Sequence, residues 1–510
     1  MKKVLIVIAL NMFVLHACKT ATSTNNQVGA AYVSEEIAPL KAPFAMPELQ
    51  RPVFPDTTVY LLRNNIADSM QTDHINRHIT TLSEAGGGTI SLEKGKWYAG
   101  RIELKSNINL HIPEGAEVYF SNKIEDYLPV VFTRFESEEC FSSGAFIYAN
   151  NQENIALTGS GKLVGPELKC PLFELFWDAF NNRKMKKIHV DTPVAERIYD
   201  GSSPDMPMLL PKTFSPINCK NVWVEGIRIE GCLTWNIAPI YCENVIIRGI
   251  NVYSVGVPTG DGIDIESTKN VLIEYCTLSN GDDCFTIKSG RGEDGVRVNR
   301  PSENIIIRYC LSLEGHGGVT CGSETAAGIK RVYVHDCVFN GTDCGLRFKT
   351  RRGRGGGGDS LYFERIHIKD ASDALNWDML GNHYFMGELA DRTLLCEKNS
   401  LTPAFSNIFI KDMVIENARR FIAVSGIPES PLTNVIVENA TVSCEKLPEF
   451  TDVDGFYIKN SSITSPDSTM FFLDARNVIF DNVKMILPGE LHIKKDGNLT
   501  DNIIINNALR

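Results

Sequence analysis

An asparagine followed by a run of β-branched and other apolar residues recurs along most of this chain. Copies begin at Asn221, Asn244 and Asn270, which are 23 and 26 residues apart by their numbers, and the copies at Asn407 and Asn434 are 27 apart. Further copies begin at Asn154, Asn304, Asn477 and Asn502. Periods in this range are typical of solenoids, and no unit has room for a helical crossover.

Repeats that cannot bury their own apolar face stack on their neighbours, so that one core runs through all of them. We therefore predict an all-β fold, a right-handed parallel β-helix. The alternative is a β-sandwich, but the apolar runs are continuous rather than alternating, as in strands buried on both faces.

A solenoid needs a cap at its end. Residues 73–82 place Ile75, Ile79 and Leu82 on one helical face, and a glycine run at 86–88 ends the helical pattern. We expect an N-terminal capping helix here, with the first coil starting at Gly88.

The first residues have the pattern of a bacterial export signal. Lys2 and Lys3 precede an apolar run that is too short to span a bilayer, and Leu15-His16-Ala17-Cys18 resembles a lipobox. The sequence predicts a signal peptide at 1–18, lipidation of Cys18, a tether at 19–55 and a β-helix domain at 56–510. The mature protein would then be a lipoprotein of the cell envelope, in the periplasm or on the outer membrane.

Charge and cysteine content narrow the possible partners. A formal net charge of −11 without a basic tail argues against a nucleic-acid binder.

Thirteen of the 14 cysteines remain after Cys18, an odd number, and several lie in apolar strands. We expect mostly buried thiols rather than a disulfide framework, and no Cys or His cluster suggests a metal site or a cofactor. We expect a monomer.

The segment from residue 261 to 349 carries the candidate chemistry, in this order: Asp261, Asp282-Asp283, His316, and the pair Arg347 and Lys349. Residues one coil apart stack about 4.8 Å from each other in a β-helix. Asp261 and Asp282 are 21 residues apart, and 33 residues separate Asp283 from His316 and His316 from Lys349. The site residues could therefore line one face of the solenoid, although the Asp and His motifs alone would be ordinary turns and Arg347 and Lys349 alone an exposed edge pair.

These residues resemble the polygalacturonase family, glycoside hydrolase family 28, whose segments are Asn-Thr-Asp, Gly-Asp-Asp, Gly-His-Gly and Arg-x-Lys. One segment departs from the pattern, because Thr259-Gly260-Asp261 stands where the family has Asn-Thr-Asp. The resemblance implies an inverting glycoside hydrolase that cleaves α-linked galacturonic acid bonds in pectic polysaccharide.

The resemblance also implies roles for the site residues. Asp282 would be the general acid, and Asp261 and Asp283 would activate water. His316 would orient or tune the acid, while Arg347 and Lys349 would hold a galacturonate carboxylate.

The loop at 291–303 and the segments around Glu324 and residues 351–353 look like the exo-acting bacterial branch of the family. In that interpretation Arg291 and Glu324 contribute to substrate binding, and the loop closes one end of the groove. Trp235 could stack on a sugar ring or could be buried in the sheet.

Three alternatives remain at this stage. The same scaffold could hydrolyse a rhamnogalacturonan backbone, a pectate lyase would use the carboxylates to bind Ca²⁺, and an adhesin would only bind glycan.

Overall fold

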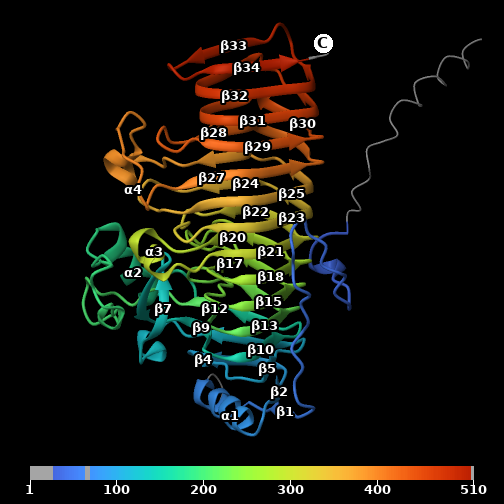
Figure 1. The fold of residues 1–510 in the computed structure, drawn as a ribbon. Coiled ribbons are helices and arrows are strands. Elements are labelled where there is room, and N and C mark those ends of the chain that lie inside the picture. Colours follow the sequence, from blue (N-terminus) through green and yellow to red (C-terminus); the bar gives the residue numbers. More distant parts are fainter. Residues whose placement is uncertain (1–26, 64–68, 507–510) are drawn as a thin grey trace, which may run out of the picture.

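Short strands stacked in parallel form a rod-shaped β-helix (Figure 1). The computed structural model describes residues 27–63 and 69–506. The predicted parallel β-helix is confirmed. The predicted signal peptide and the lipidation site Cys18 lie outside the described residues and stay predictions. No helix within the described ranges is long and apolar enough to cross a membrane.

Three ladders of strands run along the rod. The first contains the asparagine repeats, and its strands are β2 (Gly88–Leu92), β5 (Ile108–His111), β10 (Glu153–Thr158), β13 (Lys220–Glu225), β15 (Glu243–Arg248), β18 (Lys269–Glu274), β21 (Ser302–Arg308), β23 (Ile329–Asn340) and β25 (Gly357–Lys369). The second contains β3 (Gly95–Ala99), β6 (Ala116–Phe120), β11 (Lys162–Val164), β14 (Arg228–Glu230), β16 (Asn251–Ser254) and β19 (Thr277–Asn280).

The third ladder carries the candidate site. Its strands are β4 (Ile102–Glu103), β9 (Ala145–Asn150), β12 (Lys212–Ile217), β17 (Ile263–Glu266), β20 (Phe285–Lys288), β22 (Leu311–Cys321), β24 (Thr342–Lys349) and β26 (Asp373–Asp378). Longer strands complete the C-terminal coils: β27 (Ala404–Lys411), β28 (Val414–Ser425), β29 (Leu432–Glu438), β30 (Thr441–Lys446), β31 (Glu449–Thr464), β32 (Thr469–Ile486), β33 (His492–Asp496) and β34 (Asp501–Asn506).

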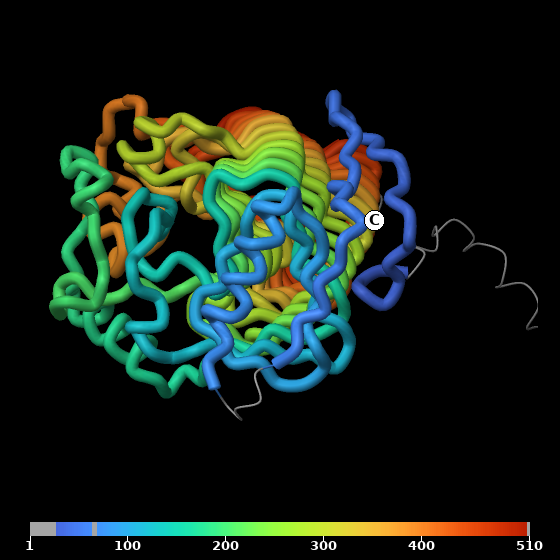
Figure 2. Tube along the Cα trace, turned by 90° about the horizontal axis from the view of Figure 1, so that it is seen from below, coloured from blue at the N-terminus to red at the C-terminus, as the bar shows by residue number. Residues whose placement is uncertain are grey.

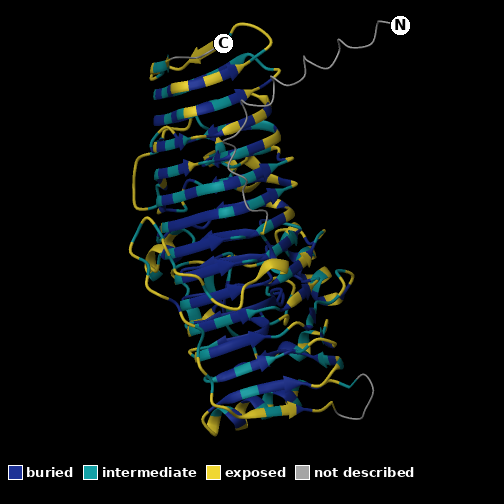
Figure 3. Cartoon of the chain, turned by 90° about the vertical axis from the view of Figure 1, so that its right-hand side faces the viewer, coloured by how far each residue is buried: buried dark blue, intermediate teal, exposed yellow. Residues whose placement is uncertain are grey.

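Inward side chains form one continuous core, seen as buried stretches on successive strands (Figure 3). Val222, Val245, Val271 and Ile305 stack in register along the first ladder.

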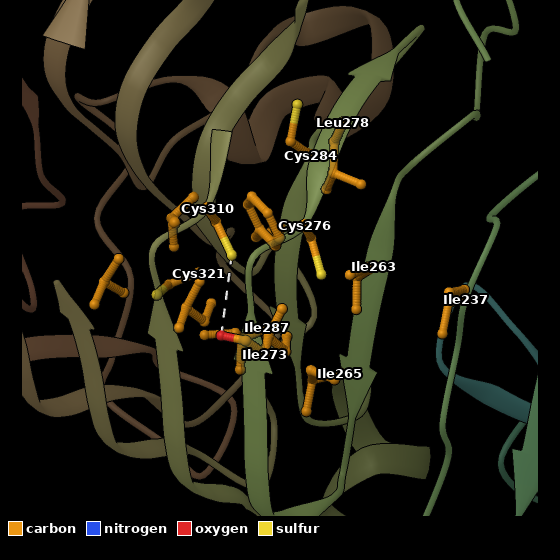
Figure 4. Close-up of a cluster of buried hydrophobic side chains, with 14 of the residues drawn as sticks. Ile237, Ile263, Ile265, Ile273, Cys276, Leu278, Cys284, Ile287, Cys310 and Cys321 are labelled. Carbon is orange, nitrogen blue, oxygen red and sulfur yellow. Dashed lines mark hydrogen bonds between the residues drawn. The ribbon is translucent and has the colours of Figure 1, made fainter. Parts of the chain in front are cut away.

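Cysteines pack among these aliphatic side chains, and the thiol of Cys310 donates to the Ile273 carbonyl at 3.9 Å (Figure 4). All thirteen cysteines of the described residues are free thiols, and all but Cys396 are buried. The expectation of buried thiols is confirmed.

The repeated asparagines hold a bend that ordinary residues avoid. Asn221, Asn244, Asn270 and Asn304 have φ between 54° and 58°, the left-handed region that costs other L-residues about 1–2 kcal/mol. Each side-chain amide donates to the Oδ1 of the previous asparagine, at 2.9–3.1 Å. At the next coil Arg331, with φ of 53°, donates to Asn304 at 2.7 Å, so a residue of another type continues the bend where the sequence repeat pauses.

The capping helix is α1 (Thr72–Glu84), which covers the N-terminal end of the rod (Figures 1 and 2). It buries Ile75, Ile79 and Leu82, as the sequence predicted. The sheet begins before Gly88, however, because β1 (Thr58–Leu61) pairs with β2.

Residues 27–55 differ from the predicted tether, because they pack along the outside of the first ladder (Figure 1). Leu49 lies in an outer cluster with Ile246, Leu272, Ile306 and Tyr333. The strands of the first ladder carry apolar residues on both faces here. Residues 27–55, which we call the N-terminal strap, cover the outer face.

Several insertions lie together on one side of the rod, beside the third ladder (Figure 1). They contain the antiparallel pair β7 (Val131–Phe135) and β8 (Glu138–Ser142), and the helices α2 (Pro171–Asn181), α3 (Gly292–Val298) and α4 (His383–Met386). The predicted loop at 291–303 thus contains α3, and its last two residues belong to β21.

We expect Asn270→Ala to lower the free energy of unfolding by roughly 2–3 kcal/mol. It removes two hydrogen bonds between coils and places alanine in the left-handed region. Urea unfolding measures the change. Asn270→Gly loses the same hydrogen bonds without the backbone strain, so it should cost about 1 kcal/mol less than alanine. Equal losses in the two variants would contradict the backbone argument.

Candidate active site

Backbone register places the predicted residues in one region of the third ladder. Asn236 N donates to Asp261 O at 2.9 Å, and Gly262 N donates to Asp283 O at 2.9 Å. Trp235, Asp261 and Asp283 therefore occupy one column on successive rungs. The spacing of 21 residues predicted that Asp282 lies one rung from Asp261, but Asp283 takes that register position and Asp282 lies beside it.

The three carboxylates converge, since each offers an oxygen within 4.8 Å of the other two. Asp261 and Asp283 are buried, whereas the Asp282 side chain is 22% exposed. Asp282 is thus the member of the trio that a large external molecule can reach.

His316 lies on β22 beside the exposed carboxylate. Its Nδ1 is 3.0 Å from Asp282 Oδ1, and its backbone N donates to Asp282 O at 3.0 Å. The hydrogen bond to Asp282 raises the pKa of His316. The imidazole is about half exposed, so it connects Asp282 with solvent.

Arg347 and Lys349 point to the same side of β24 and both contact Asp283. Lys349 Nζ lies 2.6 Å from Asp283 Oδ2, and Arg347 Nη1 lies 3.1 Å from Oδ1. Burial by itself would raise the pKa of Asp283, but Lys349 and Arg347 outweigh it and hold the pKa below its usual range. Asp283 is therefore held in its ionised form.

Lys288 on β20 is a site residue that the sequence analysis missed. Its Nζ lies 3.1 Å from Asp261 Oδ2 and 2.6 Å from Asp264 Oδ1. Burial lowers the pKa of Lys288, but these two carboxylates outweigh it and hold the pKa above its usual range. Burial, and then the neighbouring Asp264, raise the pKa of Asp261. The pKa of Asp264 is raised by burial to about 7.

These residues could have been found in the sequence from the alternation of charged and apolar residues in the strands β17 and β20. Asp264 and Glu266 alternate with isoleucines, and Lys288 follows in register one coil later. Charged residues on the outer face of an otherwise apolar strand can be read from the sequence. Which of these charged residues form ion pairs can be seen only once the register between the strands is known.

Three residues that were predicted to bind substrate instead contact other residues of the protein. The Trp235 ring is buried, with Lys288 Nζ 3.6 Å from its centroid, which agrees with the second of the two possibilities given for it, burial in the sheet. Glu324 is buried and accepts from Arg354 Nη1 at 2.7 Å. Arg291 is partly exposed on the rim, 3.7 Å from Glu136.

Carboxylates in such a cluster can bind a divalent cation. Here ammonium and guanidinium groups already contact the oxygens of Asp261 and Asp283. The cluster therefore has internal partners for its charge.

Comparison with known proteins places this geometry in a family. The profile of "Glycosyl hydrolases family 28" matches residues 200–380, which include every residue of the carboxylate cluster. A "Probable polygalacturonase" from Vitis vinifera is 27% identical over 400 residues, 76% of this chain and 73% of the relative. An "Exo-poly-alpha-D-galacturonosidase" from Dickeya chrysanthemi is 32% identical over 111 residues, which cover 22% of this chain and 18% of the relative.

Among solved structures, a hyperthermoactive exopolygalacturonase from Thermotoga maritima superposes with a TM-score of 0.71 at 28% identity, covering 81% of this chain and 93% of that one. The profile match, these relatives and the shared β-helix agree with the family segments at Asp261, Asp282, His316 and Arg347. The chain belongs to glycoside hydrolase family 28, and it is a glycoside hydrolase.

Proposed function

We propose that the protein hydrolyses α-linked galacturonic acid bonds in pectic polysaccharide, acting from a chain end and with inversion. The observation that carries the proposal is the convergence of Asp261, Asp282 and Asp283 within 4.8 Å, with His316 on the exposed member. The names of the relatives, polygalacturonase and exo-galacturonosidase, support the choice of substrate.

In this proposal Asp282 protonates the leaving oxygen. It is the exposed carboxylate of the trio, and His316 Nδ1 lies 3.0 Å from it. A general acid of this kind contributes about a hundredfold to ten-thousandfold to the rate. His316 would position Asp282 and return a proton to it from solvent.

Asp261 and Asp283 would activate the attacking water. Arg347 and Lys349 keep Asp283 ionised, which a base requires. Arg347 has five N–H donors, and its contact with Asp283 leaves others for a substrate carboxylate.

Inversion comes from the resemblance to the family, and the carboxylate spacing does not by itself favour it. The separation within 4.8 Å is shorter than the roughly 6.5–9.5 Å usual for inverting enzymes. The configuration of the first product therefore decides this part of the proposal.

The insertions support action from a chain end. The helix α3 is anchored across the rim of the third ladder by Asp294, whose Oδ1 lies 2.8 Å from Arg197 Nη1. Arg297 also pairs with Glu139 on β8. Such anchoring would let α3 and the β7–β8 pair act as a fixed wall at one end of a groove.

The pectate lyase alternative is disfavoured. Lys288, Arg347 and Lys349 occupy carboxylate oxygens that a lyase would offer to Ca²⁺. A hydrolase keeps its activity in a chelator and forms saturated products.

Asp282→Asn should lower turnover on polygalacturonate about a hundredfold or more, because the amide cannot donate the required proton. Reducing-sugar release measures turnover, and the thermal unfolding midpoint should stay near that of the unchanged protein. Asp343→Asn is the matched control, since Asp343 is an exposed carboxylate 4.0 Å from His316 Nε2. Turnover of Asp282→Asn near the wild-type value would remove Asp282 from its role.

The first product from a long galacturonan should be a monomer, or a single small product, of β configuration, while viscosity falls slowly. Chromatography, viscometry and early-time proton NMR measure these properties, with an endo-acting enzyme run in parallel. Mixed oligomers with a rapid drop in viscosity would overturn the exo assignment. An α product would overturn inversion, and the hydrolase assignment would survive both results.

Lys349→Met should lower the free energy of unfolding at pH 7 by about 3 kcal/mol or more, because it leaves Asp283 buried with one partner fewer. The depressed pKa of Asp283 means that its ion pairs stabilise the fold above the unfolded pKa and that this contribution is lost as pH falls through the folded pKa. In the variant, protonation of Asp283 removes the poorly paired charge. Urea unfolding should thus show a smaller difference from the wild type at pH 4 than at pH 7.

The same substitution in an Asp283→Asn background is the control. Its effect there should be much smaller, since no buried charge is left behind. Equal effects in both backgrounds would show that Lys349 stabilises the fold without Asp283.

A further inference from the structure

A small cavity lies beside the carboxylate cluster, between the sheet and the insertions. Its volume is about 40 Å³. It is lined by β7, by α2, by Lys212 at the start of β12, and by Trp235 and Thr259 on the approaches to the site. Thr259 is two residues before Asp261, so the cavity adjoins the reaction centre.

Lys212 is a buried cation without a carboxylate partner. Its Nζ donates to Arg134 O at 2.8 Å and lies 5.2 Å from the centroid of the Trp235 ring. Within the described residues no carboxylate oxygen lies within 4.0 Å of it, and Glu266 and Asp264 act on it only from a longer distance. Other cations nearby are paired: Lys288 with Asp261 and Asp264, Arg134 with Glu266, and Arg354 with Glu324. An ammonium has three donors, and burial of an unpaired charge is costly.

Other polar atoms of the lining residues also lack partners. Within the described part of the chain, Thr133 Oγ1, Arg134 Nε, Trp177 Nε1 and Thr259 Oγ1 are buried and make no hydrogen bond. Buried polar atoms are rarely left unpaired in proteins. The residues around this cavity thus carry several polar atoms whose hydrogen-bonding capacity is not used within the protein.

The register places Lys212 in the same column as the site carboxylates. Thr213 N donates to Trp235 O at 3.1 Å and Asn236 N donates to Asp261 O at 2.9 Å, so Lys212, Trp235 and Asp261 lie on successive rungs. Two rungs correspond to about 10 Å. A sugar bound at Asp261 would therefore have the cavity next to it, on the side of α2 and the β7–β8 pair.

We infer that this cavity is the specificity pocket for the carboxylate of the terminal galacturonate, and that Lys212 binds that carboxylate. This inference rests on the proposed function. A volume of about 40 Å³ holds a few water molecules at roughly 10–15 Å³ each, so it accepts a carboxylate and leaves the ring outside.

The lining combines apolar side chains with Lys212, Arg134 and the carboxylate of Glu136, which pairs with Arg291 at 3.7 Å. Phe176, Phe180, Leu209 and Leu210 line the cavity, and in apolar surroundings an ammonium attracts a carboxylate more strongly than it does in water. Arg347 and Lys349 are already paired with Asp283. Lys212 is therefore the cation nearby whose charge a substrate carboxylate would balance first.

The test is calorimetric titration of the intact protein with D-galacturonate, with its methyl ester and with D-galactose. The unchanged protein should bind galacturonate roughly tenfold to a hundredfold more tightly than either neutral sugar. Lys212→Met should reduce galacturonate binding to the level of the neutral sugars and leave theirs unchanged. It removes an unpaired buried charge, so it should fold, and the thermal unfolding midpoint checks this.

Lys184→Met is the matched control, because Lys184 is an exposed lysine just after α2 and the net charge changes equally. It should keep the wild-type preference. The ester comparison uses the unchanged protein and does not depend on any variant folding.

Two results would overturn the inference: no preference for galacturonate in the unchanged protein, or a preference that persists in Lys212→Met. The second would assign carboxylate recognition to Arg347 and Lys349. Failure of the proposed function is seen separately, as absence of product from galacturonan, because the titrations measure binding of monomers and need no turnover.

Discussion

The parallel register between neighbouring coils is the constraint on which the site depends. Backbone hydrogen bonds fix each rung about 4.8 Å from the next, so a side chain's neighbours are set by its column and not by its distance in sequence. Asp261 and Asp283 meet because Gly262 N donates to Asp283 O. The asparagine ladder and the core both enforce this register, since a slip of one residue would turn the inward aliphatic residues outward.

Charge balance is the second condition that the fold satisfies around the cluster. Three carboxylates cannot all remain ionised within 4.8 Å of each other unless cations offset them. Lys349 and Arg347 serve Asp283, while Lys288 is shared between Asp261 and Asp264. The result is a set of carboxyl groups with different proton affinities on one face, which acid and base catalysis requires.

The insertions decide what can reach this face. A bare β-helix presents an open groove, whereas here α2, α3 and the β7–β8 pair rise beside the third ladder (Figure 1). Ion pairs such as Arg197 with Asp294 tie these segments to one another. The scaffold thus supplies the geometry of the site, and the added segments form one of its boundaries.

The sequence by itself determined the solenoid, the capping helix and the membership of the cluster. These features follow from local patterns: the repeat length, the apolar runs and the helical face formed by Ile75, Ile79 and Leu82. Local patterns can be read from the sequence without a tertiary structure. The Asp, His and Arg-x-Lys segments pointed to the site through their coil spacing and through their resemblance to a known family.

Only the tertiary structure decided which charged residues form ion pairs and which residues are buried. The pairing of Arg347 and Lys349 with Asp283, the burial of Trp235 and Glu324, and the position of Lys288 depend on register and on loops of unequal length, which sequence spacing does not fix. Residues 27–55 were predicted to be part of a tether because they follow the export signal and a polar run. Their packing depends on an outer apolar column on β15, β18, β21 and β23 that forms only when distant coils stack. The position of Lys212 also belongs to the tertiary structure, because a lysine without a carboxylate partner can be recognised only when all of its neighbours are known.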